Sequence, residues 1–342
     1  MFVYYCFSYL LLVLISMRIN CIVALNMPPL DQKTSNNPWP SEGGSKRHIS
    51  DYKARENHPT SYDDSPAFKG PIVLERPSST SEHHTRLSHY YSQNGLVLSK
   101  QEALHPKSPT SLILQTIVDH FAYHDAPVDV KEICESIEFY ARTRKRMFGA
   151  AKKKRSRITG KKNPTNYSVN VLDCCAGHGL TGMLFSACNP GKEVYTTLVD
   201  SIEPPSHQIL RDLLVEICPW VEGRVSFYTM KLKSYQEFCK LKGDKEETLP
   251  VVIATHACGS LTDQVLELGV DLGACGLATM PCCYTGTSKD TPYGIKRALG
   301  VSWAADIRRS FFLTEKGYHT DFATIPSEIT PMNRIIVGEL RD

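Results

Sequence analysis

Two aspartates and a glycine-containing turn carry the clearest chemical signal in this sequence. Asp173 is followed by Cys-Cys-Ala-Gly-His-Gly, and Asp200 lies 27 residues beyond it. Each aspartate ends an apolar, β-branched run that is typical of a buried strand. A carboxylate at the first strand tip suits a cationic amino-acid group, and one at the second tip can accept from both hydroxyls of a ribose. The pattern predicts a site for a ligand that carries both groups. The alternative is that Asp173 caps the next helix and Asp200 starts a turn.

The same turn argues against a dinucleotide site. A pyrophosphate is bound by a G-x-G-x-x-G turn that opens a helix, whereas this chain has only Gly177-His178-Gly179 after an acid. Because the acid would repel a pyrophosphate, a sulfonium nucleoside such as S-adenosylmethionine fits better. The residues expected to bind this cofactor are Asp173, Ala176, Gly177, Gly179, Asp200 and His256.

A second group of reactive side chains follows two later strands. The sequence reads T-H-A-C-G-S-L-T-D over 255–263 and M-P-C-C-Y over 280–284. His256 is the best candidate for a general base, because imidazole titrates near neutral pH. We expect Cys282 and Tyr284 to line the acceptor pocket, where Tyr284 can stack on a flat acceptor. The alternative is that His256 only positions its loop, and Asp263 either orients His256 or sits in the first turn of the next helix.

Cysteines are concentrated at these same strand ends. Of the twelve cysteines, ten lie beyond residue 110, and five of those sit at the ends of three expected strands: Cys174, Cys175, Cys258, Cys282 and Cys283. Three interpretations stay open, namely close packing, a metal or iron–sulfur site, and a nucleophilic thiolate at Cys282. The absence of a C-x-x-C pair disfavours metal. The cysteine content favours a reducing compartment.

The elements that must position these residues alternate between strand and helix from Tyr167 onward. This rhythm predicts a parallel sheet covered on both faces. Only Pro326–Met332 separates the last two strands, which is too short for a helical crossover, so one of them is expected to run antiparallel. The expected strands are Val169–Asp173, Val194–Asp200, Arg224–Thr229, Pro250–Thr255, Gly276–Pro281, His319–Ile325 and Asn333–Glu339, with helices near 179–188, 203–217, 234–241, 261–269 and 294–313. We therefore predict an α/β, Rossmann-like, seven-stranded, mostly parallel sheet that ends in an antiparallel hairpin.

The strand-tip motifs resemble a known family. H-A-C-G-x-x-T-D followed by P-C-C, with T-P-M-N at 330–333, is similar to the methyltransferase-domain family found in the glutathione S-transferase C-terminal domain-containing protein and in bacterial methyltransferase-like proteins. A more distant similarity is to the tRNA 2′-O-methyltransferases. The resemblance covers about residues 111–342, and it implies a class I fold and S-adenosylmethionine as cofactor more firmly than any acceptor.

Two departures from the family pattern affect the cofactor site. Cys175 stands where the family's turn has its first glycine, which crowds the turn slightly. Met230 and Lys231 follow the third strand, where related enzymes often place an acid or an amide near the adenine. Adenine recognition is therefore not predicted from these residues.

The N-terminal third has the composition of targeting and linker segments. Residues 2–17 are an almost unbroken apolar run, so residues 1–24 are expected to form a signal or targeting segment, with a membrane anchor as an alternative. Residues 25–110 are polar and aperiodic and are expected to be a disordered leader. A helical extension is expected over 111–166 and the methyltransferase domain over 167–342. A signal core followed by a polar stretch resembles the leaders of proteins sent through the secretory pathway to a plastid-like organelle; the cytoplasm and the endomembrane system are alternatives.

Positive charge is concentrated just before the expected domain. Residues 142–162 hold eleven Lys or Arg and no acid, so the chain's net charge of +3 becomes −8 outside this segment. Such a run can bind RNA phosphates without sequence preference, or it can be a solvated linker. The expected function is an S-adenosylmethionine-dependent methyltransferase (EC 2.1.1 class) acting on tRNA or rRNA, with RNA held by the Arg142–Lys162 segment. The alternatives are a non-catalytic RNA- or protein-binding module on the same fold and a protein or small-molecule methyltransferase.

Overall fold

The computed structural model describes residues 108–164, 167–242, 248–284, 286–287, 291–326 and 329–341. These residues all belong to one compact unit, His58–Asp342. The predicted targeting segment and the predicted leader up to residue 107 lie outside the described residues. The first described helix, α4, begins at Pro109, where Ser108 caps it by accepting from the Ser111 N–H.

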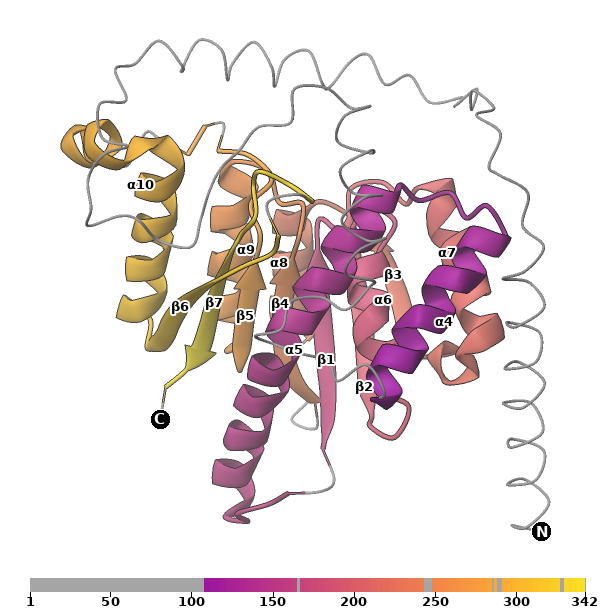
Figure 1. Cartoon of the computed structure of the whole chain (residues 1–342). Helices are drawn as coiled ribbons and strands as arrows, with labels where there is room; N and C mark the ends of the chain where they lie inside the picture. The colour runs from indigo at the N-terminus through magenta and orange to yellow at the C-terminus, as the bar shows by residue number, and fades with distance from the viewer. Residues whose placement is uncertain are drawn as a thin grey trace, which may run out of the picture. The chain divides into compact units, whose positions relative to one another are not determined.

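Seven strands form one sheet in the order β3-β2-β1-β4-β5-β7-β6 (Figure 1). The strands β1 to β5 are parallel to one another, and β7 is antiparallel to both β5 and β6. Their bounds are β1 Ser168–Cys174, β2 Val194–Asp200, β3 Val225–Thr229, β4 Thr248–Ala254, β5 Gly276–Thr279, β6 Tyr318–Thr324 and β7 Arg334–Leu340. The predicted fold class, including the antiparallel hairpin, is confirmed.

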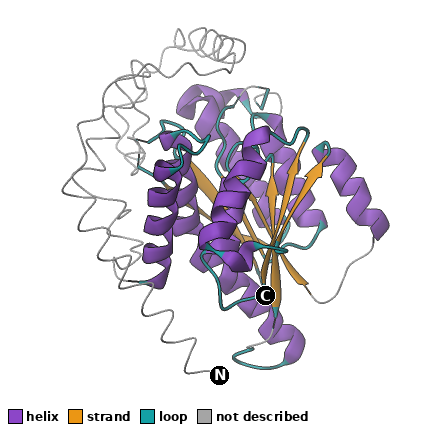
Figure 2. Cartoon of the chain, turned by 90° about the vertical axis from the view of Figure 1, so that its right-hand side faces the viewer, coloured by secondary structure: helices purple, strands orange, loops and turns teal. Residues whose placement is uncertain are grey.

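Helices cover both faces of this sheet (Figure 2). They are α4 Pro109–Tyr123, α5 Val130–Thr159, α6 Leu180–Ala187, α7 Pro205–Ile217, α8 Leu232–Lys242, α9 Ser260–Asp271 and α10 Tyr293–Glu315, with a short 3₁₀ turn at Pro219–Val221. The helical path of α10 is interrupted at Gly300, which has a φ of 77°. Each predicted helix of the α/β region is present, with ends that differ by a few residues.

Alternation along the strands produces two separate cores. Successive strand residues point to opposite faces, so Val171 and Ile253 pack on the side of α4 to α7, whereas Leu172 and Val252 pack on the side of α8 to α10. All four side chains are at most 2% exposed. Burial on both faces explains why the central strands read as continuous apolar runs rather than as alternating ones.

The basic segment is part of a long helix rather than a linker. α5 runs without a break from its N-cap Asp129 to Gly160, which ends the helix in the left-handed conformation, and it packs on α6, β4, β5 and β7. Several of its cations bond back to the domain. Arg146 bonds to Asp321 and Glu339, and the Lys154 ammonium donates to the Gly273 carbonyl oxygen over 2.8 Å. The solvated-linker alternative is therefore wrong for the helical part of this segment. Gly149 lies inside the helix and does not interrupt it.

No helix among the described residues combines the length and the apolar character needed to cross a membrane.

Candidate cofactor site at the strand tips

Asp173 is a buried carboxylate at the end of β1. Its side chain is 1% exposed, and Oδ2 accepts from the Gly182 main-chain N–H over 2.9 Å. Oδ1 is buried and has no hydrogen-bond partner among the described residues. Burial raises the pKa of Asp173 to about 7, and the nearby Asp200 carboxylate adds to the rise. One carboxylate oxygen therefore caps α6 at its third residue, which confirms the predicted alternative that Asp173 caps the next helix. The other oxygen is available to a ligand.

Asp200 lies at the end of β2, the strand next to β1. Its Oδ2 accepts from the Gly177 N–H over 2.9 Å, and its Oδ1 accepts from the Ser201 N–H over 2.6 Å. The side chain is half-buried. A carboxylate has about four lone-pair directions, so Asp200 can hold this turn and still accept from the hydroxyls of a ribose.

The turn between β1 and α6 depends on positive φ angles. Gly177 and Gly179 have φ values of 55° and 80°, and Cys175 has 58°. A Cβ at Gly179 would collide with the Leu198 side chain, whereas a Cβ at Gly177 would meet open space. Cys175, which was predicted to crowd the turn, has a left-handed backbone conformation, and this is unfavourable for a residue with a Cβ. Ala176 is buried and donates to the Val199 carbonyl oxygen over 3.2 Å, which fixes the turn against β2.

Sequence reasoning did not identify Glu132, which contacts this turn from α5. Its carboxylate lies 3.2 Å from Nε2 of His178, and the Leu180 N–H donates to Nδ1 of the same ring. Since Nδ1 accepts, Nε2 carries the proton and donates to Glu132. This hydrogen bond lowers the pKa of Glu132 to about 2. A residue 46 positions away in the sequence gives no local signal for such a contact.

His256 follows β4 and is surrounded by charged groups of α5. Burial lowers its pKa below the ordinary value, and the carboxylate of Glu135 opposes this effect. Glu135 is 3% exposed, its Oε1 is paired with Lys131 over 2.8 Å, and its Oε2 is buried without a partner among the described residues. The imidazole of His256 is neutral at pH 7, as a general base must be before it accepts a proton.

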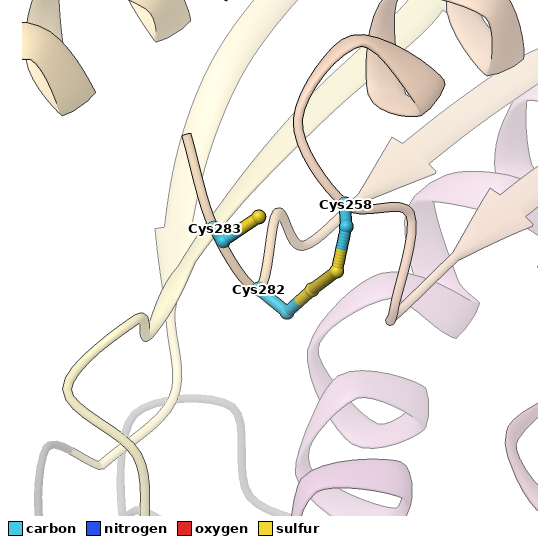
Figure 3. Close-up of side chains that lie close together, drawn as sticks. All are labelled: Cys258, Cys282 and Cys283. Carbon is cyan, nitrogen blue, oxygen red and sulfur yellow. A yellow bond between two sulfur atoms is a disulfide. The ribbon is translucent and has the colours of Figure 1, made fainter. Parts of the chain in front are cut away.

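Cys258 and Cys282 are joined by a disulfide that links the loops after β4 and β5 (Figure 3). Their Cα atoms are 5.6 Å apart, and Cys283 is a free, buried cysteine beside them. Because the sulfur of Cys282 is already bonded, it offers no thiolate, and the nucleophile interpretation of Cys282 does not hold in this state. The two cysteines at the tip of β1, Cys174 and Cys175, are free.

Tyr284 does not offer a free face to an acceptor. The guanidinium groups of Arg309 and Arg334 lie 5.6 and 5.7 Å from the centre of its ring, and its side chain is 6% exposed. Its hydroxyl donates to Asp306 over 2.5 Å and accepts from Arg334 over 3.1 Å. The expected stacking role of Tyr284 is therefore corrected to an internal one, in which it belongs to a buried ionic network.

The same network accounts for Asp263. Its carboxylate accepts from Arg308 over 2.7 Å and from Arg309 over 3.1 Å, and it lies in the first turn of α9. Of the two predicted roles, the helical position is confirmed and the orientation of His256 is not. The competing guanidinium groups come from α10, which the local sequence around Asp263 does not reveal.

One protein-family model matches part of this chain. Residues 135–290 match the model of a family described as a methyltransferase domain. This match begins inside α5, earlier than the predicted domain start at residue 167, in line with the packing of α5 on the sheet. No curated protein matches the chain.

Solved structures that match the chain include three from different organisms. An O-methyltransferase family protein from Burkholderia thailandensis is 12% identical, with 75% of this chain and 83% of that chain covered and a TM-score of 0.33. The SAH-bound methyltransferase PaMTH1 of Podospora anserina is 10% identical, with 78% and 99% covered and a TM-score of 0.38. The Methanococcus jannaschii fibrillarin pre-rRNA processing protein is 12% identical, with 56% and 76% covered and a TM-score of 0.33.

The sheet order, the carboxylates at two neighbouring strand tips and the match over residues 135–290 together indicate a methyltransferase domain in this part of the chain.

Proposed function

We propose that this chain transfers the methyl group of S-adenosylmethionine to RNA. The main observation behind the catalytic part of this proposal is that Asp173 and Asp200 lie at neighbouring strand tips. The two aspartates end adjacent parallel strands, and a glycine turn that bonds to Asp200 lies between them. Ligands of open α/β sheets bind beyond the carboxyl ends of the strands, which is where both acids lie.

The residues at this edge fit the cofactor. The unpartnered Oδ1 of Asp173 is a buried acceptor, and such an atom costs free energy unless a donor reaches it. The open space at Gly177 leaves room for a ligand beside the main chain. Asp173 would accept from the cationic amino group of the methionine end, and Asp200 would accept from the ribose hydroxyls. The bound cofactor supplies an activated methyl group on a positive sulfur.

The chain itself has two tasks, to align the acceptor and to remove one proton. Alignment supplies most of the rate, because the methyl group is already activated. His256, neutral at pH 7, accepts the proton from the attacking atom. The carboxylate of Glu135 then stabilises the imidazolium that forms, since it already opposes the depression of the pKa of His256. Glu132 holds His178 in one tautomer and so fixes the wall of the turn.

The acceptor part of the proposal rests on the surface of α5. This helix begins beside His178, at the carboxyl ends of the parallel strands, and runs to their amino ends (Figure 1). There Lys154 bonds to the Gly273 carbonyl oxygen and Arg157 to the Arg341 carbonyl oxygen. At 1.5 Å per residue, its 30 residues span about 45 Å. Lys152, Lys161 and Lys162 are exposed at that far end. RNA is a polyanion long enough to contact these lysines and also to reach His256, whereas a metabolite is too small to do both.

For the location of the protein, we propose an organelle reached through the secretory pathway. The apolar run at residues 2–17 supports this. The Cys258–Cys282 disulfide, which forms under oxidising conditions, also supports it and speaks against the reducing compartment that the cysteine content favours. Microscopy of the full chain with a C-terminal fluorescent tag tests it, and a uniformly cytoplasmic signal would contradict it.

The acceptor is tested by incubating the full chain with methyl-labelled S-adenosylmethionine and separate cellular fractions of RNA, protein and small molecules. We expect label in RNA, absent with the Asp200→Ala variant. Label in protein or in metabolites would overturn the acceptor and keep the enzyme. Binding of S-adenosylhomocysteine without transfer to any fraction would favour a non-catalytic binding module on the same fold.

A further inference from the structure

Three side chains that the methyl-transfer site does not use meet where α4 approaches α7. His120 and His124 lie four residues apart at the end of α4, and Glu216 lies in the last turn of α7. The apolar face of α4, formed by Leu114, Ile117 and Phe121, packs into the core, so the helix is anchored beside this group.

The geometry brings one donor atom from each side chain into a small volume. Nε2 of His120 lies 3.0 Å from Oε2 of Glu216, and the ring centroids of His120 and His124 are 4.4 Å apart. One ligand atom of each residue lies within 4.8 Å of the other two. Within the described residues, a second such group comprises Cys258, Cys282 and Cys283, but two of its sulfurs are already joined in the disulfide.

The donor set identifies the class of cation. Two imidazole nitrogens and one carboxylate oxygen suit Zn²⁺ and neighbouring transition metals, whereas Ca²⁺ and Mg²⁺ take oxygen ligands. Zinc–ligand distances of about 2.0–2.2 Å place tetrahedral donors roughly 3.4 Å apart. Nε2 of His120 and Oε2 of Glu216 lie 3.0 Å apart, so a small widening brings them to that separation. His124 is exposed at the C-cap of α4, and one of its ring nitrogens already lies within 4.8 Å of the donor atoms of the other two.

We propose that His120, His124 and Glu216 form a zinc site that clamps α4 to α7, with water as the fourth ligand. The cation replaces the direct contact between His120 and Glu216 and bonds to both. Since the three donors come together only in the folded chain, bound zinc stabilises the native state. The site is independent of the methyl-transfer residues at the strand tips.

Titration calorimetry of the metal-free full chain with Zn²⁺ alone tests this. We expect one saturable site that His124→Ala and Glu216→Gln each weaken by at least about tenfold, since even the loss of a group behind a ligand costs that much. Both side chains are exposed, so neither variant is expected to impair folding. His319→Ala, which removes an exposed histidine from β6, is the matched control and leaves the affinity unchanged.

Two further readouts separate this site from other histidines of the chain. Substituted Co²⁺ gives the intense visible bands of tetrahedral coordination in the wild type and loses them in Glu216→Gln. At the same zinc concentration, zinc raises the melting temperature of the wild type more than that of His124→Ala. The absence of zinc binding, or equal zinc affinity in the wild type and both variants, would overturn the proposal.

Discussion

The Gly177 N–H donates a hydrogen bond of 2.9 Å to Oδ2 of Asp200, so the glycine turn after β1 is tied to the tip of β2. The same carboxylate holds the Ser201 N–H through its other oxygen. Asp200 thus positions the turn, and its remaining lone pairs can accept from a ligand. The same side chain therefore has a structural role and a role in cofactor binding.

Replacement of Asp200 by alanine removes both functions. We expect Asp200→Ala to weaken S-adenosylhomocysteine binding by about tenfold or more, since a hydrogen bond to a charged group contributes about 1.5–3 kcal/mol. Thermal shift in the presence of the ligand measures this. Asp212→Ala, an exposed aspartate on α7, is the matched control. Equal ligand-induced shifts in the two variants would contradict the assignment.

The buried carboxylate of Asp173, which we expect to bind the cofactor, lowers the free energy of unfolding when it is ionised. Its pKa is about 7 in the folded chain against an ordinary value of 3.8, so the folded state holds this proton more tightly than the unfolded state. The free energy of unfolding therefore falls as pH rises from about 4 to 7, by at most about 4 kcal/mol from this group. Asp173→Asn carries no such charge.

We therefore expect the stability of Asp173→Asn relative to wild type to increase from pH 5 to pH 8, while cofactor binding is lost. Urea unfolding without ligand at the two pH values measures the first effect, and calorimetry with S-adenosylhomocysteine measures the second. A stability difference that does not change with pH, or retained binding, would show that Asp173 does not carry this charge.

His256 and Glu135 are expected to act differently on the rate. His256→Ala removes the proton acceptor and should lower kcat by about 10² to 10⁴-fold. Glu135→Gln leaves the base but removes the charge that opposes the depression of its pKa, so the acid limb of the pH–rate profile moves to lower pH. Rates within twofold of wild type for His256→Ala would leave His256 only a role in holding its loop.

Reduction of the Cys258–Cys282 disulfide is expected to destabilise the domain. The bond closes a loop of 24 residues, and release of such a loop costs about 3 kcal/mol in the unfolded-chain entropy model. Dithiothreitol should lower the wild-type melting temperature and have no further effect on Cys258→Ser. Cys283→Ser keeps the disulfide and should remain sensitive, as the control. A wild-type melting temperature unaffected by dithiothreitol would contradict the bond.

The far end of α5 is expected to contribute to RNA affinity. Changing Lys152, Lys161 and Lys162 to glutamine should weaken RNA binding and reduce its salt dependence, because fewer counterions are released. The matched control changes Lys192, Lys233 and Lys316, three exposed lysines outside this helix. Filter binding over a series of salt concentrations measures both. If both triple variants lost the same RNA affinity, the loss would come from the lower net charge and not from the far end of α5.

The sequence was sufficient to predict the sheet and the positions of its acids. Asp173 and Asp200 end buried strands, and this local pattern needs no tertiary information. The seven residues between the last two expected strands exclude a helical crossover, which predicted the antiparallel arrangement of β6 and β7. The length of this connection was enough to predict the antiparallel pair.

Contacts between distant segments were not predictable in the same way. Glu132 reaches His178, and Arg309 and Arg334 enclose Tyr284, through the packing of helices that the local patterns do not specify. The charge of α5 was visible in the sequence, but its periodicity did not show that Arg146 and Lys154 would bond to the sheet side of the domain. Buried ionic partners depend on tertiary geometry rather than on residue type.

The central claim is that the strand-tip carboxylates bind S-adenosylmethionine, and titration calorimetry of the full chain with S-adenosylhomocysteine tests it most directly. We expect saturable one-to-one binding that Asp200→Ala weakens by about tenfold or more and that Asp212→Ala leaves unchanged. The absence of binding to the wild type, or equal affinity in wild type and Asp200→Ala, would contradict it.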